Sequence, residues 1–264
     1  MTAIAGQQKQ SGETNQKMPW RWFLDIFITP KKVFSAIQES DRRLWVLPML
    51  VLSGLLIILS LVSGPGRLIN AQMSLSQPPS DFQYWTAEQQ TQFFEGQQAM
   101  QGPLFIYIFP LLGSLISFWL GWFVLGSIFH LLMTFKGSRQ PQLAYHNMVA
   151  WAAVPFALRC LVQIIAALAT HQVVDAPGLS GFVASGGSGS MALLRILLGF
   201  IDVYSLAFIT LSLIGAPVVS SLKKEKSLWV AVLALFIFVV LAVLPKFIMS
   251  QIDGLGTIRP FIMF

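Results

Sequence analysis

Long runs of apolar residues, separated by short polar segments, dominate the chain. Each run exceeds the length of about 18 residues that marks a membrane helix, and none alternates apolar with polar positions as a barrel strand would. The predicted spans cover residues 44–62, 104–133, 145–169, 191–219 and 228–250. The expected fold class is therefore all-α, a polytopic membrane protein with five transmembrane helices.

Composition supports this interpretation. Of the 264 residues, 55% are hydrophobic and only 11% are charged, and the mean hydropathy is +0.68. Soluble domains carry about 25% charged residues, so the chain is predicted to lie in a lipid bilayer. The net charge of +6 comes from basic residues that flank the apolar runs. We therefore do not expect a nucleic-acid partner.

The first 40 residues divide into two predicted segments. Residues 1–18 are polar and rich in glutamine, which is typical of a disordered tail. Residues 19–40 are predicted to form an amphipathic segment at the membrane interface, with Thr29 capping a helix that has Pro30 in its first turn. The segment either anchors the first span or contacts a partner or acidic lipid headgroups. The residues predicted for this contact are Trp20, Trp22, Phe23, Phe27, Pro30, Lys31, Lys32 and Phe34.

Two polar connections are predicted to lie outside the cell. Residues 64–103 form a long loop in which Thr86 and Gln89 have the spacing of a capping box, and we expect a small helical cover or a lid over a ligand. The glycine-rich stretch 181–190 lacks the Gly-Lys-Ser/Thr ending of a phosphate-binding loop. Residues 251–264 are predicted to be a short external tail.

The distribution of lysine and arginine predicts the orientation, because basic loops stay in the cytoplasm. With the N-terminus in the cytoplasm and the C-terminus outside, the loops on the opposite side contain only Arg67 and Arg259. The basic residues on the cytoplasmic side are then Arg21, Lys31, Lys32, Arg42, Arg43, Lys136, Arg139, Lys223, Lys224 and Lys226.

Two charged residues fall inside the predicted spans. Arg159 lies in the third span and Asp202 in the fourth, each about 15 Å from one membrane face at 1.5 Å per residue. Because the two spans are consecutive and antiparallel, we expect an intramembrane ion pair that faces the bundle interior. Its role is either to set the register of two helices or to bind an ion or proton. Arg195 and Lys246 lie nearer the outer ends, where long side chains can reach the interface.

Other residues are assigned to helix packing. Gly113, Ser117 and Gly121 recur at every fourth position, which lets helices approach closely, and Pro155 interrupts the third span. Cys160 is the single cysteine, so no intrachain disulfide is possible. His130 and His146 are too few for a metal site. No catalytic constellation is present, so neither an enzyme nor a cofactor is expected.

Three features in a fixed order resemble the Yip family of membrane proteins, named for interaction with Ypt/Rab GTPases. They are Phe27-x-x-Pro30-x-x-Val33-Phe34-x-x-Ile37, the basic turn Phe135–Pro141, and the small-residue run Ala144–Pro155. The likeness covers residues 23–250 and implies five spans with a cytoplasmic N-terminus. The short tail and long external loop resemble the prokaryotic members, so a role beside transporters or other membrane complexes is expected rather than Rab binding.

The function expected is a non-enzymatic membrane scaffold or accessory subunit in the plasma membrane, with the lipid bilayer and other membrane proteins as partners. The alternative is a small-molecule or ion carrier that uses Arg159 and Asp202 at the bilayer midplane.

Overall fold

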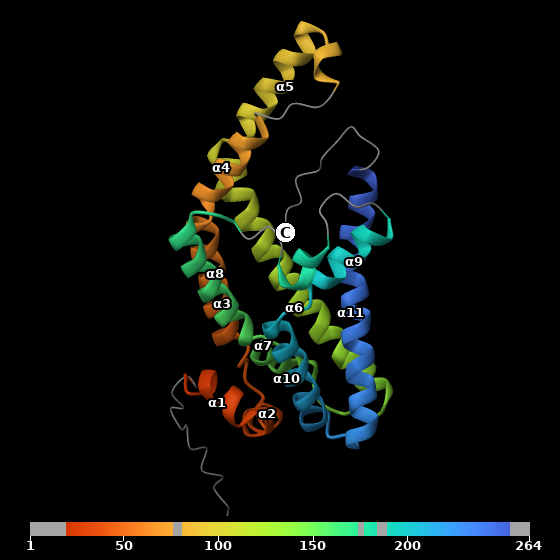
Figure 1. The fold of residues 1–264 in the computed structure, drawn as a ribbon. Coiled ribbons are helices and arrows are strands. Elements are labelled where there is room, and N and C mark those ends of the chain that lie inside the picture. Colours follow the sequence, from red (N-terminus) through yellow and green to blue (C-terminus); the bar gives the residue numbers. More distant parts are fainter. Residues whose placement is uncertain (1–19, 76–80, 174–176, 184–188, 254–264) are drawn as a thin grey trace, which may run out of the picture.

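A computed structural model describes residues 20–75, 81–173, 177–183 and 189–253, and over these residues all regular structure is helical (Figure 1). The predicted tail 1–18 and most of the predicted tail 251–264 lie outside the described residues. The elements are α1 Trp22–Ile28, α2 Pro30–Gln38, α3 Val46–Val62, α4 Gly64–Leu75, η1 Phe82–Tyr84, α5 Ala87–Met100, η2 Leu104–Ile108, α6 Phe109–Phe135, α7 Gln142–Ala152, α8 Pro155–Thr170, η3 Gly178–Phe182, α9 Ser190–Gly199, α10 Val203–Ser220 and α11 Lys224–Asp253.

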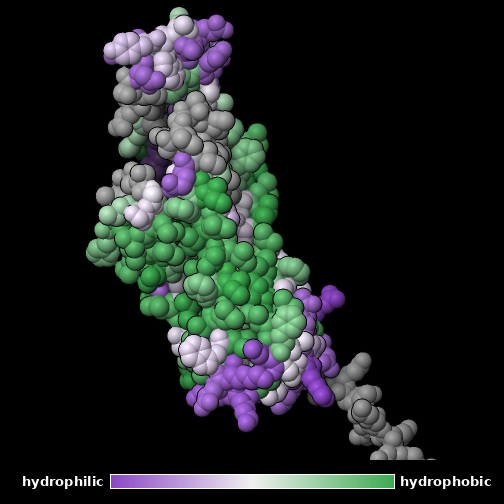
Figure 2. Space-filling model, turned by 90° about the vertical axis from the view of Figure 1, so that its right-hand side faces the viewer, coloured by the Kyte–Doolittle hydropathy of each residue, from purple (hydrophilic) through white to green (hydrophobic). Residues whose placement is uncertain are grey.

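Several helical segments are long and apolar enough to cross a membrane. Four satisfy this test alone: Leu104–Phe135, Gln142–Thr170, Val203–Ser220 and Lys224–Gln251. A fifth arises if α3 and α4, which are bent by 42° relative to each other, count as one crossing. Figure 2 shows the matching surface, a broad apolar belt between two polar ends. The prediction of an all-α, multi-spanning membrane protein is confirmed.

The core of the bundle is centred on α7. Every residue from Ala144 to Ala152 is buried, including Tyr145 and Trp151, which are fully inaccessible. α7 can be enclosed in this way because α2, α3, α6 and α10 all contact it. This core lies toward the end of the bundle where α1 and α2 are found (Figure 1). We call this end, formed by α1, α2 and the turns 136–141 and 221–223, the basic end.

The third predicted span is two helices rather than one. α7 ends at Ala152, and α8 begins at Pro155, which occupies the first helical position. Proline is favoured there because its missing N–H would have no partner in the first turn of a helix. Pro155 is buried, and Val154 N–H donates to Trp151 O at 3.3 Å across the break.

The fourth span, predicted as one helix over 191–219, is wrong. The structure divides it into α9, which ends at Gly199, and α10, which begins at Val203. Asp202 causes the division, because its Oδ1 accepts the Ser205 N–H at 2.7 Å and so caps a new helix. α9 has 10 residues, about 15 Å of helix, and cannot cross a hydrocarbon core of about 30 Å. It packs obliquely against α11 and η3 (Figure 1).

The segment predicted as an external cover forms α4 and α5, and α5 lies at the far end of the molecule from α1 and α2 (Figure 1). The predicted capping box is confirmed: Thr86 Oγ1 accepts the Gln89 N–H at 3.3 Å, and Gln89 Oε1 accepts the Thr86 N–H at 3.0 Å. No residue of α5 is buried. A cluster of aromatic rings from Phe82, Trp85 and Phe93 holds η1 against α5.

Candidate functional site

Arg159 and Asp202 meet inside the bundle. Arg159 Nη1 on α8 lies 3.3 Å from Asp202 Oδ2 at the start of α10, and the side chains are 26% and 14% exposed. Among the residues that the structure describes, no other carboxylate lies within 4.0 Å of a basic nitrogen. The structure therefore brings together the two intramembrane charges that the sequence singled out.

The two carboxylate oxygens of Asp202 have different partners. Oδ1 accepts the Ser205 N–H at 2.7 Å, and Oδ2 faces the Arg159 guanidinium. A single side chain therefore starts α10 and ties that start to α8. The sequence placed Asp202 in the middle of a continuous helix, which is wrong, because the side chain competes for the backbone N–H of the first turn and ends the preceding helix.

A third charged residue lies beside the break between α9 and α10. Lys246 on α11 has its Nζ 5.2 Å from the centroid of the Phe200 ring, a cation–π distance. Phe200 belongs to the break between α9 and α10. The sequence predicted only that Lys246 would reach toward the interface. Phe200, the aromatic residue just before the break, is a signal that could have predicted this position of Lys246.

The N-terminal segment packs into the bundle with its apolar face. Val33, Phe34 and Ile37 on α2 are at most 2% exposed, and α2 contacts α10 and α7. The approach is close at Gly215 on α10, where an added Cβ would lie 3.0 Å from the Phe34 ring. The prediction that Phe34 contacts a partner is therefore wrong, because this face of α2 is buried against the protein core.

The remaining predicted contact residues behave in two ways. Trp22 and Phe23 pack on Trp151, each with ring centroids 5.2 Å apart, and are only partly accessible. Pro30 is half-buried at the first position of α2. The exposed members are Trp20, Phe27, Lys31 and Lys32. The expected Thr29 cap is wrong: the Thr29 hydroxyl donates to Asp25 O of α1 at 3.4 Å instead.

Asn147 joins α7 to the approach to α3, a role that sequence patterns missed. This fully buried side chain accepts the Trp45 N–H through Oδ1 and donates through Nδ2 to Arg42 O, both at 2.9 Å. Nearby, Trp151 Nε1 donates to Leu44 O at 3.1 Å. An asparagine inside an apolar run was the available signal, because a buried amide needs partners for both ends.

A second polar network joins the turns of the basic end. Ser138 Oγ donates to Ser220 O at 2.8 Å and lies 2.7 Å from the Tyr145 hydroxyl. Gln38 Nε2 on α2 donates to Ser221 Oγ at 2.7 Å. The turns at 136–141 and 221–223 are therefore bonded to each other and to the N-terminal helices.

The predicted stripe of small residues on α6 only partly packs. Gly121 faces α11, with Phe238 Cζ 3.5 Å from an added Cβ, whereas Ser117 is exposed and Gly113 is half-exposed. The tighter approach is at Gly126, where an added Cβ would lie 2.9 Å from His146 Cδ2 on α7. Sequence spacing alone did not separate these glycines.

His146 and His130 lie near the α6–α7 interface. His146 Nδ1 lies 3.0 Å from Gln142 O, and its ring packs on Trp122. The His130 ring lies 5.7 Å from that of Tyr145. Across the described ranges, no three histidine, cysteine or carboxylate side chains gather as metal ligands.

Charge is concentrated at the basic end. Figure 2 shows hydrophilic side chains covering the end of the bundle next to the apolar belt. Segments 20–43, 136–141 and 221–226 at this end contain the basic residues Arg21, Lys31, Lys32, Arg42, Arg43, Lys136, Arg139, Lys223, Lys224 and Lys226, against the acidic residues Asp25, Glu39, Asp41 and Glu225. The excess of positive charge is suited to an anionic membrane surface or partner.

Comparison with protein families decides what kind of bundle this is. The model of the Yip1 domain matches residues 24–244, from α1 to the outer part of α11. The chain belongs to the Yip1 domain family. The matched region of this Yip1 domain includes the ion pair, α7, α2 and most of α1, and the resemblance inferred from sequence motifs is confirmed. Comparisons with curated proteins and with solved structures gave no match.

Proposed function

We propose that this Yip1 domain protein is a non-enzymatic membrane scaffold or accessory subunit that organises other membrane proteins or their transport. The observation that carries the proposal is the closely packed centre of the bundle. α7 is buried from Ala144 to Ala152, and the amide of its Asn147 is hydrogen-bonded at both ends to backbone groups of the protein. A buried, internally bonded centre supports a structural role.

The proposed contact surface is the outer face of α1. Trp20, Leu24, Phe27 and Ile28 form an apolar stripe, and they are 60%, 70%, 44% and 76% exposed. Exposed apolar side chains gathered on one face mark an interaction site. The stripe adjoins the lysines of α2, so a partner with an apolar surface and acidic rim would fit it.

The basic end is proposed to face the cytoplasm, with the C-terminus outside and the protein in the plasma membrane. Lysine and arginine gather at this end, whereas the projecting α5 contains Glu88 and Glu95 and no basic residue. This asymmetry supports the orientation, because basic segments are retained on the cytoplasmic side.

Site-specific photocrosslinking in membranes of the native host tests the scaffold. A crosslinking amino acid replaces Trp20 or Phe27 in the full chain, and Tyr84, which is 81% exposed on the opposite projection, serves as the matched control position. We expect a defined protein adduct from the two α1 positions that disappears in L24E. Protein that stays monodisperse and forms adducts only with lipid at both α1 positions would contradict the scaffold.

One observation favours a second candidate, an ion or small-molecule carrier. Arg159 and Asp202 pair where the chain is interrupted between α9 and α10, Lys246 lies beside the same break, and interrupted helices with charged groups occur in transporters. Flux across proteoliposomes that is lost in D202N and retained in the surface control K224Q would support the carrier. Flux equal to that of protein-free liposomes would exclude it for the solutes tested.

A further inference from the structure

We propose that the groove where α1 meets α2, beside α10, binds one anionic phospholipid. The bound lipid would place its phosphate at Lys31, beside α10, and an acyl chain along Ile28 and Ile214, while Lys32 on the other side of the helix start adds positive charge. This goes beyond the scaffold, because it concerns the lipid around the protein; the two proposed surfaces share Ile28, so a lipid and a protein partner would compete there.

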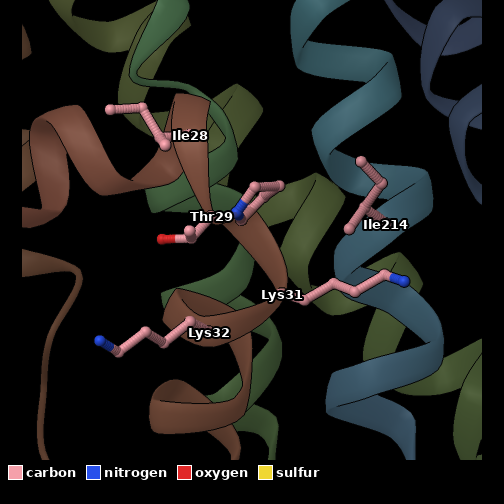
Figure 3. Close-up of a pocket in the computed structure, with 6 residues that line it drawn as sticks. Ile28, Thr29, Lys31, Lys32 and Ile214 are labelled. Atoms are coloured by element: carbon pink, nitrogen blue, oxygen red, sulfur yellow. The ribbon is translucent and has the colours of Figure 1, made fainter.

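The groove is formed by the beginning of α2 and the adjacent face of α10. Figure 3 shows its lining, which consists of Ile28, Thr29, Pro30, Lys31, Lys32 and Ile214. Its volume is about 400 Å³, and it is open to the surroundings. A cavity of this size can hold a headgroup and the first part of a chain, while the rest of the lipid stays in the bilayer.

The lysines supply unpaired positive charge. Both side chains are exposed, and the ion pair described above is the one such contact in the part of the chain that the structure covers, so neither lysine is neutralised there. In Figure 3, Lys31 extends toward α10 below Ile214, and Lys32 extends to the other side of the helix start. The N-terminal end of α2, with Pro30 at its first position, adds the positive pole of the helix dipole.

The apolar wall favours a lipid over a soluble anion. Ile28 is 76% exposed, and Ile214 is half-buried on α10, which is a candidate span. Figure 2 shows that the hydrophilic basic end directly borders the apolar belt. A phosphate at Lys31 therefore sits at headgroup level, and its acyl chain meets the apolar side chains of the groove. Inorganic phosphate would gain nothing from the isoleucines.

Native mass spectrometry of the full chain in mild detergent tests the proposal. Occupancy by phosphatidylglycerol and by phosphatidylcholine is titrated for the wild type, for K31Q/K32Q and for the matched double variant K223Q/K224Q at the same end. Each lysine near an anionic surface contributes about fivefold in affinity, so K31Q/K32Q should weaken phosphatidylglycerol binding by about 30-fold. K223Q/K224Q and phosphatidylcholine binding should change little.

Further measurements separate the sources of binding. Glycerol phosphate, which has the headgroup chemistry without acyl chains, should not compete with phosphatidylglycerol for the groove. The I28S variant should bind long-chain phosphatidylglycerol more weakly than the wild type. Melting curves recorded without lipid identify any variant that fails to fold, and single variants then replace the double one. Equal losses in both double variants, or full competition by glycerol phosphate, would overturn the proposal. Displacement of bound phosphatidylglycerol by an acidic peptide added at the same concentration would also overturn the proposal.

Discussion

The Asp202→Asn variant tests the central ion pair with the smallest change in shape. Asparagine caps helices about as well as aspartate, so its side-chain oxygen can still accept the Ser205 N–H that Asp202 accepts at 2.7 Å. The variant removes only the negative charge, which lies 3.3 Å from Arg159. The amide that replaces it is neutral and cannot balance the positive charge of the guanidinium. Any loss of stability therefore reports on the pair rather than on the cap.

The expected cost follows from the burial of Arg159. Breaking a buried pair by removing one member costs about 3–5 kcal/mol, and insertion of arginine at the centre of a membrane helix costs about 2.5–3.5 kcal/mol. Because the Arg159 side chain is 26% exposed, we expect the lower part of these ranges, about 2.5–3 kcal/mol. D202A should lose about 1 kcal/mol more, since it also removes the cap.

Reversible unfolding in mixed micelles provides the assay. The eight tryptophans report on tertiary structure and circular dichroism reports on helix content, as the fraction of denaturing detergent increases. The complete cycle compares wild type, D202N, R159M and the double variant R159M/D202N. Because the double variant has no uncompensated charge, it should be more stable than D202N, with a coupling free energy of about 2 kcal/mol or more.

The reasoning would be refuted by a coupling free energy near zero. In that case each single variant would act independently, and contact between the two side chains would contribute nothing to the bundle. A D202N protein as stable as the wild type, with R159M also unchanged, would show that Arg159 is satisfied by water or lipid headgroups instead.

Three further predictions concern packing, polar contacts and orientation. Gly126→Ala should destabilise the α6–α7 interface by about 1–3 kcal/mol in thermal unfolding, because the added Cβ would lie 2.9 Å from an imidazole carbon, whereas Gly121→Ala, at 3.5 Å from a ring carbon, should have little effect. Asn147→Ala should lower the free energy of unfolding by about 2 kcal/mol, because two buried backbone groups lose their hydrogen-bond partner. It should also accelerate tryptic cleavage in the α2–α3 connection, and cleavage at the wild-type rate would argue against this role. In C160S protein, a cysteine at Lys224 should be labelled only from the cytoplasm and one at Glu88 only from outside; the reverse pattern would invert the proposed topology.

Apolar run length predicted most of the fold. The second and fifth spans were predicted within a few residues of their ends, because their helices contain no competing cap and lie along the apolar belt. The prediction of the fourth span failed at Asp202. Its carboxylate both pairs with Arg159 and caps α10, and hydropathy carries no information about either interaction. Pattern reasoning therefore located the charge but not the helix start that it creates.

The candidate contact residues show the same limit. The helical spacing of Val33, Phe34 and Ile37 predicted a shared apolar face, and the structure has one. Whether such a face meets lipid, a partner or the protein's own core depends on residues far away in sequence. Here the face meets the protein's own core, because Gly215 has no side chain and leaves room for the Phe34 ring. No local pattern near α2 contains that information.

The position of α2 has a consequence for how the protein is made. Its polar tie to the α10–α11 turn joins residues that are 183 positions apart, and its apolar face rests mainly on α10. During synthesis α2 emerges before any of the helices that will cover it. The apolar face of α2 can therefore be covered completely only after α10 has been synthesised, which makes the N-terminal helices among the last elements to dock.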